Sequence, residues 1–139
     1  MSPSSIGCCP PRPRSRTRIF PPRLEQLERI RQFVAESAAT TSLGSSAVYD
    51  LMVAVSEASA NAIEHGLGEG DLEVSAYQSP GRFTITVRHP GAFQPRMGGD
   101  PARAHRGMGL PLMLALTNEL TVTQPKSGGT CVSLSVFLD

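Results

Sequence analysis

The sequence is poor in aromatic residues and carries almost no net charge. It has no tryptophan, aromatic side chains make up 5% of its 139 residues, and its formal net charge is +1. Proteins that bind nucleic acids usually present a basic surface, and those that bind single strands stack bases on aromatic rings. The composition therefore argues against direct contact with nucleic acid.

Long apolar runs and a cysteine framework are also missing. No run approaches the roughly 20 apolar residues that a membrane span requires, and no continuous apolar segment near the N-terminus resembles a signal peptide. Cys8 and Cys9 are adjacent and Cys131 stands alone, so the spacing indicates neither a disulfide framework nor a metal site. We therefore expect a protein of the reducing cytoplasm without membrane association.

The chain does contain enough apolar material for one domain. Hydrophobic residues make up 40% of it, and a chain of this length buries one core without disulfides or metals. Residues 1–17 are rich in proline, serine and arginine, which predicts a disordered tail. A basic docking arm is the alternative interpretation of that segment. Residues 18–139 are expected to form the single domain.

The hydrophobic periodicity alternates between helix and strand. It predicts an edge strand at 18–20, helices at about 24–38, 45–66 and 107–118, a hairpin of strands at 72–77 and 83–88, and a final hairpin at 120–124 and 130–138. Residues 90–106 break this pattern and predict a long loop. Helices interspersed with hairpins are typical of an α+β fold. We expect a two-layer α/β sandwich, with a mixed, mostly antiparallel sheet and the helices packed on one face.

The helix expected at 45–66 carries a polar stripe opposite its apolar side. At about 100° per residue, the stripe contains Glu57, Asn61, Glu64 and His65. Glu57 and Asn61 are four residues apart and are therefore neighbours on one face. An amide oxygen suits Mg²⁺ and a carboxylate can take a proton from a hydroxyl, so this pair fits chemistry on a metal–phosphate substrate. The alternative is an ordinary solvated helix face.

A glycine-rich turn opens the third helix. It reads Arg106-Gly107-Met108-Gly109-Leu110. Glycines let the backbone approach a ligand closely, and the N–H groups at a helix start favour a phosphate. Arg106 would add a charge-assisted contact. The alternative is a loop–helix joint that needs unusual backbone dihedrals.

The two motifs in this order are more specific than either one alone. Residues 55–66, VSEASANAIEHG, resemble the N-box of the GHKL ATPases, and residues 106–113, RGMGLPLM, resemble their second glycine box. Residues 128–130, GGT, resemble the late Gly-Thr element of the same family. The resemblance covers roughly residues 18–138 and points to the compact anti-sigma-factor serine/threonine-protein kinases.

The resemblance implies ATP and Mg²⁺ as ligands. Glu57 matches the catalytic base that activates a serine hydroxyl on a partner protein, and Asn61 matches the Mg²⁺ ligand. Residues 94–106 match the ATP lid, and Thr130 matches a residue that helps to hold the adenine edge. The nucleotide-binding residues expected on this basis, together with the stripe and the glycine turn, are Asn61, His65, His89, Gly91, Arg106, Gly107, Met108, Gly109, Leu110 and Thr130.

The resemblance also implies protein partners. Kinases of this type phosphorylate a STAS-type antagonist of the anti-sigma factor and sequester a sigma factor, and they often form homodimers. These partners, like the ligands, are expectations from the resemblance.

One position departs from the family pattern. The first glycine box normally reads Asp-x-Gly-x-Gly, and its Asp accepts a hydrogen bond from the adenine amino group. Here His89 stands at that position, Gly91 matches the first glycine, and the second glycine is missing. A neutral imidazole nitrogen accepts one hydrogen bond without the carboxylate's charge. The loss of a charged acceptor costs about 1.5–3 kcal/mol of binding free energy.

Two alternatives to a kinase remain at this stage. A module of the same fold that has lost tight nucleotide binding would act only by sequestering partners, and the missing Asp favours it. The catalytic half of a sensor histidine kinase is less favoured, because the sequence shows no phospho-acceptor helical hairpin.

Overall fold

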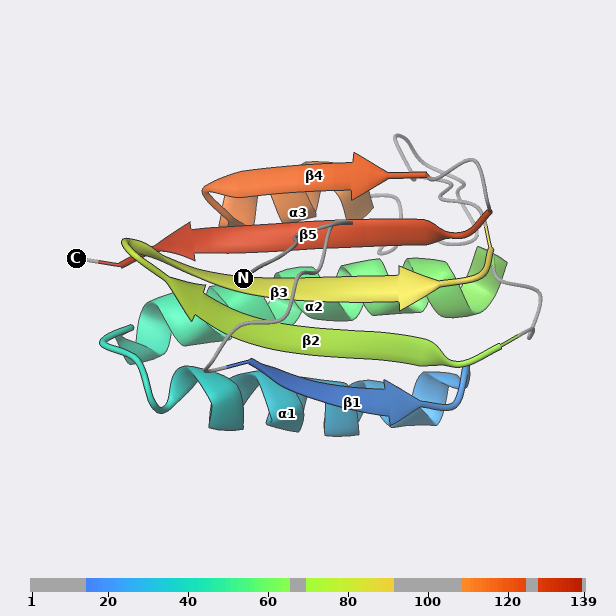
Figure 1. Cartoon of the computed structure of the whole chain (residues 1–139), viewed down its shortest axis with the longest axis horizontal. Helices are drawn as coiled ribbons and strands as arrows, with labels where there is room; N and C mark the ends of the chain where they lie inside the picture. Colours follow the sequence, from blue (N-terminus) through green and yellow to red (C-terminus); the bar gives the residue numbers. More distant parts are fainter. Residues whose placement is uncertain (1–14, 66–69, 92–108, 125–127, 139) are drawn as a thin grey trace, which may run out of the picture.

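The computed structural model describes residues 15–65, 70–91, 109–124 and 128–138, which form one sheet and one layer of helices. In chain order the elements are β1 (Arg16–Phe20), the short 3-10 helix η1 (Leu24–Gln26), α1 (Leu27–Ala38), α2 (Ser45–His65), β2 (Leu72–Ser79), β3 (Arg82–His89), α3 (Gly109–Leu116), β4 (Glu119–Thr123) and β5 (Thr130–Phe137). All three α-helices cover the same face of the sheet (Figure 1). The predicted two-layer α+β sandwich with helices on one face is therefore confirmed.

The sheet has the strand order β1-β2-β3-β5-β4, and its four pairings are all antiparallel. The hairpins β2–β3 and β4–β5 form as predicted. The prediction of a mixed sheet is wrong for the described strands, because β5 folds back between β3 and β4 and runs opposite to both. This insertion brings the end of β3 beside the start of β5.

Strand β1 begins two residues earlier than predicted. Arg16 and Thr17, expected in the disordered tail, belong to the strand. The guanidinium of Arg16 lies 5.1 Å from the centre of the Phe33 ring and donates to Ser37 Oγ at 3.0 Å. The hydroxyls of Thr17 and Ser75 lie 2.9 Å apart. These partners come from α1 and β2, so their effect is not visible in the local sequence.

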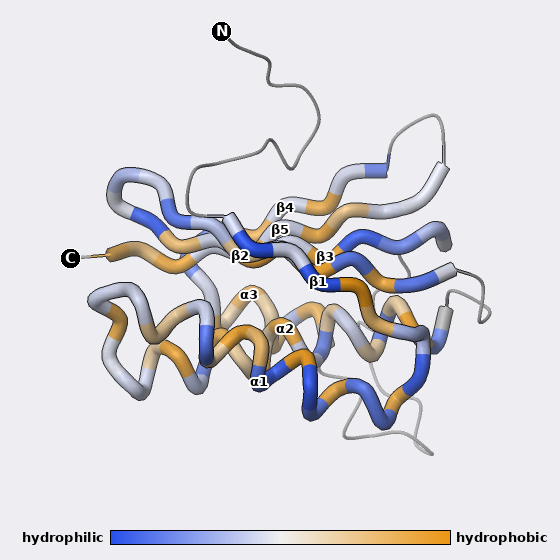
Figure 2. Tube along the Cα trace, turned by 60° about the horizontal axis from the view of Figure 1, so that its bottom comes forward, coloured by the Kyte–Doolittle hydropathy of each residue, from blue (hydrophilic) through white to orange (hydrophobic). Residues whose placement is uncertain are grey.

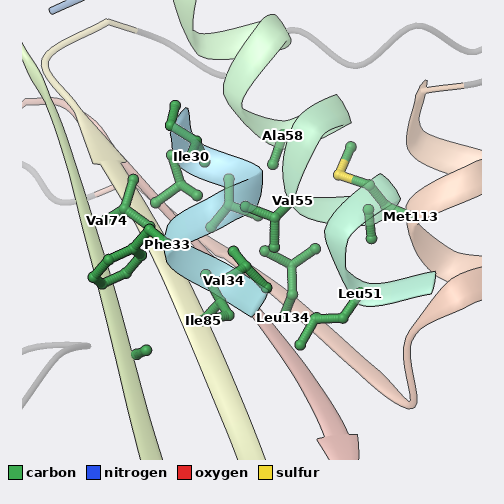
Figure 3. Packing of buried hydrophobic residues seen from close by; sticks show 14 of the residues in the cluster. Ile30, Phe33, Val34, Leu51, Val55, Ala58, Val74, Ile85, Met113 and Leu134 are labelled. Atoms are coloured by element: carbon green, nitrogen blue, oxygen red, sulfur yellow. The ribbon is translucent and has the colours of Figure 1, made fainter. Parts of the chain in front are cut away.

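The core lies between the sheet and the helices. Alternate strand residues such as Val74, Ile85 and Leu134 are fully buried on the helix side, and the register pairs Ile85 with Leu134 across β3 and β5. Figure 3 shows these side chains packed against Val55 of α2 and Phe33 of α1. Figure 2 shows the sheet and the helices as two layers, with hydrophobic residues distributed along both.

Helix α2 lies in the middle of the helical layer, between α1 and α3 (Figure 1). Alanines at positions 54, 58, 60 and 62 are buried and allow the neighbouring helices to approach closely. Helix α3 is shorter than predicted at its end, because the N–H of Asn118 donates to Ser135 O at 2.9 Å and its Oδ1 accepts from the Phe137 N–H at 2.8 Å. Within the described ranges, the model holds no helix that is both long and apolar enough to cross a membrane.

Candidate functional site

Helix α2 holds Glu57 and Asn61 within the helical layer. Asn61 is 7% exposed, and Glu57, one turn earlier, is half-buried. On the α1 side, Arg31 Nη1 donates to Ser56 Oγ at 3.0 Å. Because Asn61 is buried, a fully solvated helix face is ruled out at this position. Glu64 is half-buried, and the side chain of His65 lies outside the described residues.

The start of α3 lies near the second half of α2. Ala115 and Leu116, at the end of α3, line a cavity together with Ala47 and Asp50 at the start of α2. The two helices are therefore antiparallel, and Figure 3 places Met113 near Ala58. Figure 1 shows that the end of α2, the end of β3 and the start of β5 lie at the same end of the molecule. Gly109, the first residue of α3, thus lies toward this end of the fold.

The sequence-predicted residues of that turn are only partly described. Arg106, Gly107 and Met108 lie outside the described residues, as do residues 94–105 of the expected lid. Gly109 is the first residue of α3. Leu110 is half-buried and packs against the hydrophobic core.

The remaining predicted residues form one hydrogen-bonded turn where β3 meets β5. His89 and Thr130 are directly paired across the two strands, and both are buried. The backbone N–H of Gly91 donates to Nδ1 of His89 at 3.1 Å. The hydroxyl of Thr130 donates to the carbonyl oxygen of Gly91 at 2.7 Å. The structure therefore brings His89, Gly91 and Thr130 together, although they come from separate motifs.

Glycine is required on the β5 side of this turn. Gly129 has φ of 84°, and a Cβ at this position would lie 3.0 Å from the carbonyl oxygen of His89. Any other residue would meet both backbone strain and a backbone contact. Gly128 has φ of 104° and is also in a conformation that favours glycine. The close approach and the positive φ explain Gly129, and the positive φ alone explains Gly128.

A cavity of about 380 Å³ lies at this end of the sheet. It falls within the range of about 300–1,000 Å³ that is typical of small-molecule sites. Its lining comes from the start of β2, the end of β3 and the start of β5 and includes Asp71, Glu73, Arg88, His89, Pro90, Gly128, Gly129, Thr130 and Cys131.

Sequence reasoning did not single out Asp71, Glu73 or Arg88 as site residues. Glu73 and Arg88 are paired across β2 and β3, and Arg88 is in turn paired with Cys131 of β5. The alternation of each strand places them on the face away from the helices, but their meeting depends on the strand register. No local signal in the sequence identifies that register at the end of the sheet.

Comparison with known proteins identifies the class. The family of histidine kinase-like ATPase domains matches residues 20–136, and the chain belongs to that family. Its fold is that of the histidine kinase-like ATPase domains, as the motifs implied. A comparison with curated proteins gives no match.

Two solved structures share this fold. The RsbU and RsbW domains of Rv1364c from Mycobacterium tuberculosis align with a TM-score of 0.70 and 22% identity, over 89% of this chain and 32% of that chain. The SiaB–SiaC complex from Pseudomonas aeruginosa aligns with a TM-score of 0.56 and 12% identity, over 88% of this chain and 89% of the matched chain. At these identities the likeness is one of fold. The chain thus spans about a third of the matched Mycobacterium chain.

Proposed function

We propose that this protein is a cytoplasmic serine/threonine-protein kinase of the anti-sigma-factor type, which transfers phosphate from a nucleoside triphosphate, ATP in the family, to a partner protein. The observation that carries the proposal is the placement of Glu57 and Asn61. They lie one helical turn apart on α2, a buried amide beside a half-buried carboxylate, in the half of α2 beside which α3 begins. A surface stripe without a function would not need to bury an amide.

The donor set of α2 fits a magnesium–phosphate group. Mg²⁺ in phosphoryl-transfer sites usually takes one or two protein oxygens and completes its shell with phosphate oxygens and water. Within the described ranges, no cluster of three or more His, Cys, Asp or Glu side chains could hold a metal. Asn61 offers an amide oxygen and is the proposed Mg²⁺ ligand, and Mg²⁺ would neutralise charge on the transferred phosphoryl group.

The start of α3 is the proposed phosphate-binding element. Its N–H groups carry the positive end of the helix dipole toward the end of the molecule where β3 and β5 meet. We assign phosphate contacts to Gly107, Met108, Gly109 and Leu110 through their backbone, and a charged contact to Arg106. His65, at the end of α2, is assigned to the same nucleotide site.

Glu57 is the proposed general base. Its carboxylate would accept the proton of the acceptor serine hydroxyl as the serine oxygen bonds to the phosphoryl group. The half-buried position suits this role, because the carboxylate remains reachable by a second protein while it lies beside Asn61.

The proposed partners are a STAS-type antagonist as phosphate acceptor and a sigma factor as the sequestered protein. The SiaB structure was solved as a complex with SiaC, which supports a protein partner for this fold. A homodimer is the proposed assembly, as in the relatives that the motifs resemble.

The test is transfer of label from γ-labelled ATP or GTP to a STAS-type antagonist protein. We expect Glu57→Gln to lower the transfer rate by about 100-fold or more while nucleotide binding stays within a few-fold of the wild-type value. Glu64→Gln is the matched control, because Glu64 lies on the same stripe with the same degree of burial, and it should keep most of the activity. Equal loss in both variants, or full activity of Glu57→Gln, would refute the role of Glu57.

A second candidate function is sequestration of partners without tight nucleotide binding. It is favoured by the replacement of the usual Asp with His89, whose Nδ1 is already engaged by Gly91. Calorimetry with Mg²⁺ and ADP, GDP or their triphosphates separates the two functions. Micromolar binding of any of these nucleotides would argue against the sequestering module.

A further inference from the structure

The hydrogen bond between Gly91 and His89 determines which nitrogen of the imidazole carries the proton. A backbone N–H can only donate, so the Nδ1 of His89, 3.1 Å from the Gly91 nitrogen, must be an acceptor without a hydrogen. A neutral imidazole with a bare Nδ1 carries its hydrogen on Nε2. Toward any ligand, His89 is therefore a hydrogen-bond donor, whereas the Asp expected at this position is an acceptor.

The hydroxyl of Thr130 has its polarity set in the same way. A carbonyl oxygen can only accept, so the 2.7 Å contact between Thr130 Oγ1 and the Gly91 oxygen uses the hydroxyl hydrogen. Only lone pairs of Oγ1 remain for a ligand, which makes Thr130 an acceptor. Both polarities are imposed by the backbone of one residue, Gly91, and both side chains are buried against it.

This pair of polarities is opposite to the one that adenine needs. Adenine presents an amino donor at C6 and a bare acceptor at N1, whereas guanine and hypoxanthine present a carbonyl acceptor at C6 and an N–H donor at N1. His89 as donor and Thr130 as acceptor match the second pattern. A site built for a hydrogen-bonding pattern discriminates strongly against a ligand that leaves its buried groups unmatched.

We propose that this chain binds 6-oxopurine nucleotides, those of guanine or hypoxanthine, more tightly than adenine nucleotides, and that His89 and Thr130 are the specificity-determining residues. The inference rests on the proposed nucleotide-dependent function and changes only the base of the bound nucleotide, from adenine to a 6-oxopurine. Both residues lie at the end of the sheet, and strand alternation places their side chains on its helix side, in phase with the core residues Val87 and Val132. That is the side on which α2 carries Asn61.

Other polar groups of the cavity do not set this preference. Asp71, Glu73 and Arg88 line it, but Glu73 and Arg88 lie on the face of the sheet away from the helices, opposite to the side chains of His89 and Thr130. A carboxylate accepts from a guanine N–H as readily as from an adenine amino group, and a guanidinium donates to any base acceptor. The two groups held by Gly91 are the ones that distinguish the bases.

The binding test is calorimetric titration of the full chain with GDP, IDP and ADP in the presence of Mg²⁺. GDP and IDP are expected to bind at least about tenfold more tightly than ADP, since one mismatched hydrogen bond is worth about that factor. IDP separates the contribution of the C6 oxygen from that of the guanine 2-amino group. Equal affinities, or tighter binding of ADP, overturn the base inference and leave the kinase proposal in place, whereas absence of binding by all three overturns both.

Two variants give the reciprocal result. In His89→Asp the carboxylate can still accept from the Gly91 N–H as an Asx turn does, but it offers an acceptor to the base, so the preference should shift toward ADP by about tenfold or more. Thr130→Val should reduce the preference, and Thr130→Ser, which keeps the hydroxyl, should retain the preference for GDP and IDP over ADP. Circular dichroism confirms folding, and the Thr130 pair decides the matter if His89→Asp does not fold. An unchanged preference in every folded variant overturns the assignment.

A second measurement needs no ligand. Long-range ¹H–¹⁵N correlation spectra of the unliganded protein distinguish a bare from a protonated imidazole nitrogen, and the signals of His89 are identified by their absence from His89→Asp. We expect a bare Nδ1 and a protonated Nε2. The opposite tautomer would remove the donor on which the inference depends.

Discussion

At the scale of single residues, the buried hydroxyls show how differently the same side chain can be accommodated. Ser37 and Ser59 both lie on helices and are 3% and 0% exposed. Ser37 Oγ donates to Phe33 O at 2.8 Å and accepts from Arg16. Among the described residues, Ser59 Oγ has no hydrogen-bond partner. A buried hydroxyl without a partner costs about 1–3 kcal/mol relative to water.

Ser59→Ala is therefore expected to raise the free energy of unfolding by about 1 kcal/mol, because it removes the unsatisfied hydroxyl and alanine favours the helix. Urea denaturation at constant m-value measures the change. Ser37→Ala is the matched control and should lower stability by about 1 kcal/mol, since it leaves the Arg16 guanidinium without one of its acceptors. A loss of stability in Ser59→Ala would indicate that its hydroxyl is satisfied in solution.

The polar residues of the site follow the same logic. Asn61 on α2 and His89 on β3 are both buried, and His89 is paired with Thr130 of β5. Whether such a side chain donates or accepts a hydrogen bond depends on its surroundings, since the residue type by itself allows both roles.

At the scale of elements, the decisive feature is the approach of β5 to the end of β3. The turn before β5 passes close enough to His89 that only glycine fits at position 129. Gly81, in the turn between β2 and β3, has nearly the same dihedral, with φ of 81° against 84° for Gly129, but open space where a Cβ would lie.

A comparison of substitutions at these two glycines separates the stability cost of backbone strain from that of steric contact. Gly81→Ala is expected to cost about 1–2 kcal/mol of stability through the left-handed dihedral alone. Gly129→Ala should cost more, because the Cβ also displaces the carbonyl of His89, and it should weaken nucleotide binding in addition. Urea denaturation and nucleotide titration of both variants test this expectation. Equal costs with unchanged binding would show that the turn has room to move.

In the amphipathic helix α2, the sequence period predicts only part of the burial. Its sequence period predicts one buried side, and that side does meet the sheet through Leu51 and Val55. Its buried residues also include Asn61, which lies outside that apolar side, and α3 packs beside α2.

At the scale of the whole molecule, the antiparallel sheet sets the distribution of stability. β3 is hydrogen-bonded on both sides, to β2 and β5, whereas β1 and β4 are edge strands. Edge strands expose a row of backbone groups to solvent, and local opening starts where few bonds have to break.

Native-state hydrogen exchange should reflect this order. We expect the amides of β3 to exchange only through global unfolding, and those of β4, and next β1, to exchange through local opening with a free energy at least about 2 kcal/mol lower. Exchange followed by NMR or mass spectrometry measures both. If β1 were protected as strongly as β3, a partner covering that edge in solution would be indicated, such as a second copy of the chain.

The sequence by itself determined the two-layer α+β architecture, the two hairpins, and the placement of Glu57 and Asn61 on one helix. These features follow from local sequence, because the hydrophobic periods of helices and strands can be recognised within a run of consecutive residues. The order of the motifs also predicted the family, which the match over residues 20–136 confirmed.

Tertiary structure alone decided the early start of β1, the insertion of β5 between β3 and β4, and the burial of Asn61. It also decided the polarity of His89 and Thr130, since both depend on hydrogen bonds to Gly91 that form only when β5 returns to the end of β3. The physical reason is that side-chain polarity and burial are properties of neighbours in space. Strand order and register select those neighbours, and residues far apart in the chain then supply the partners.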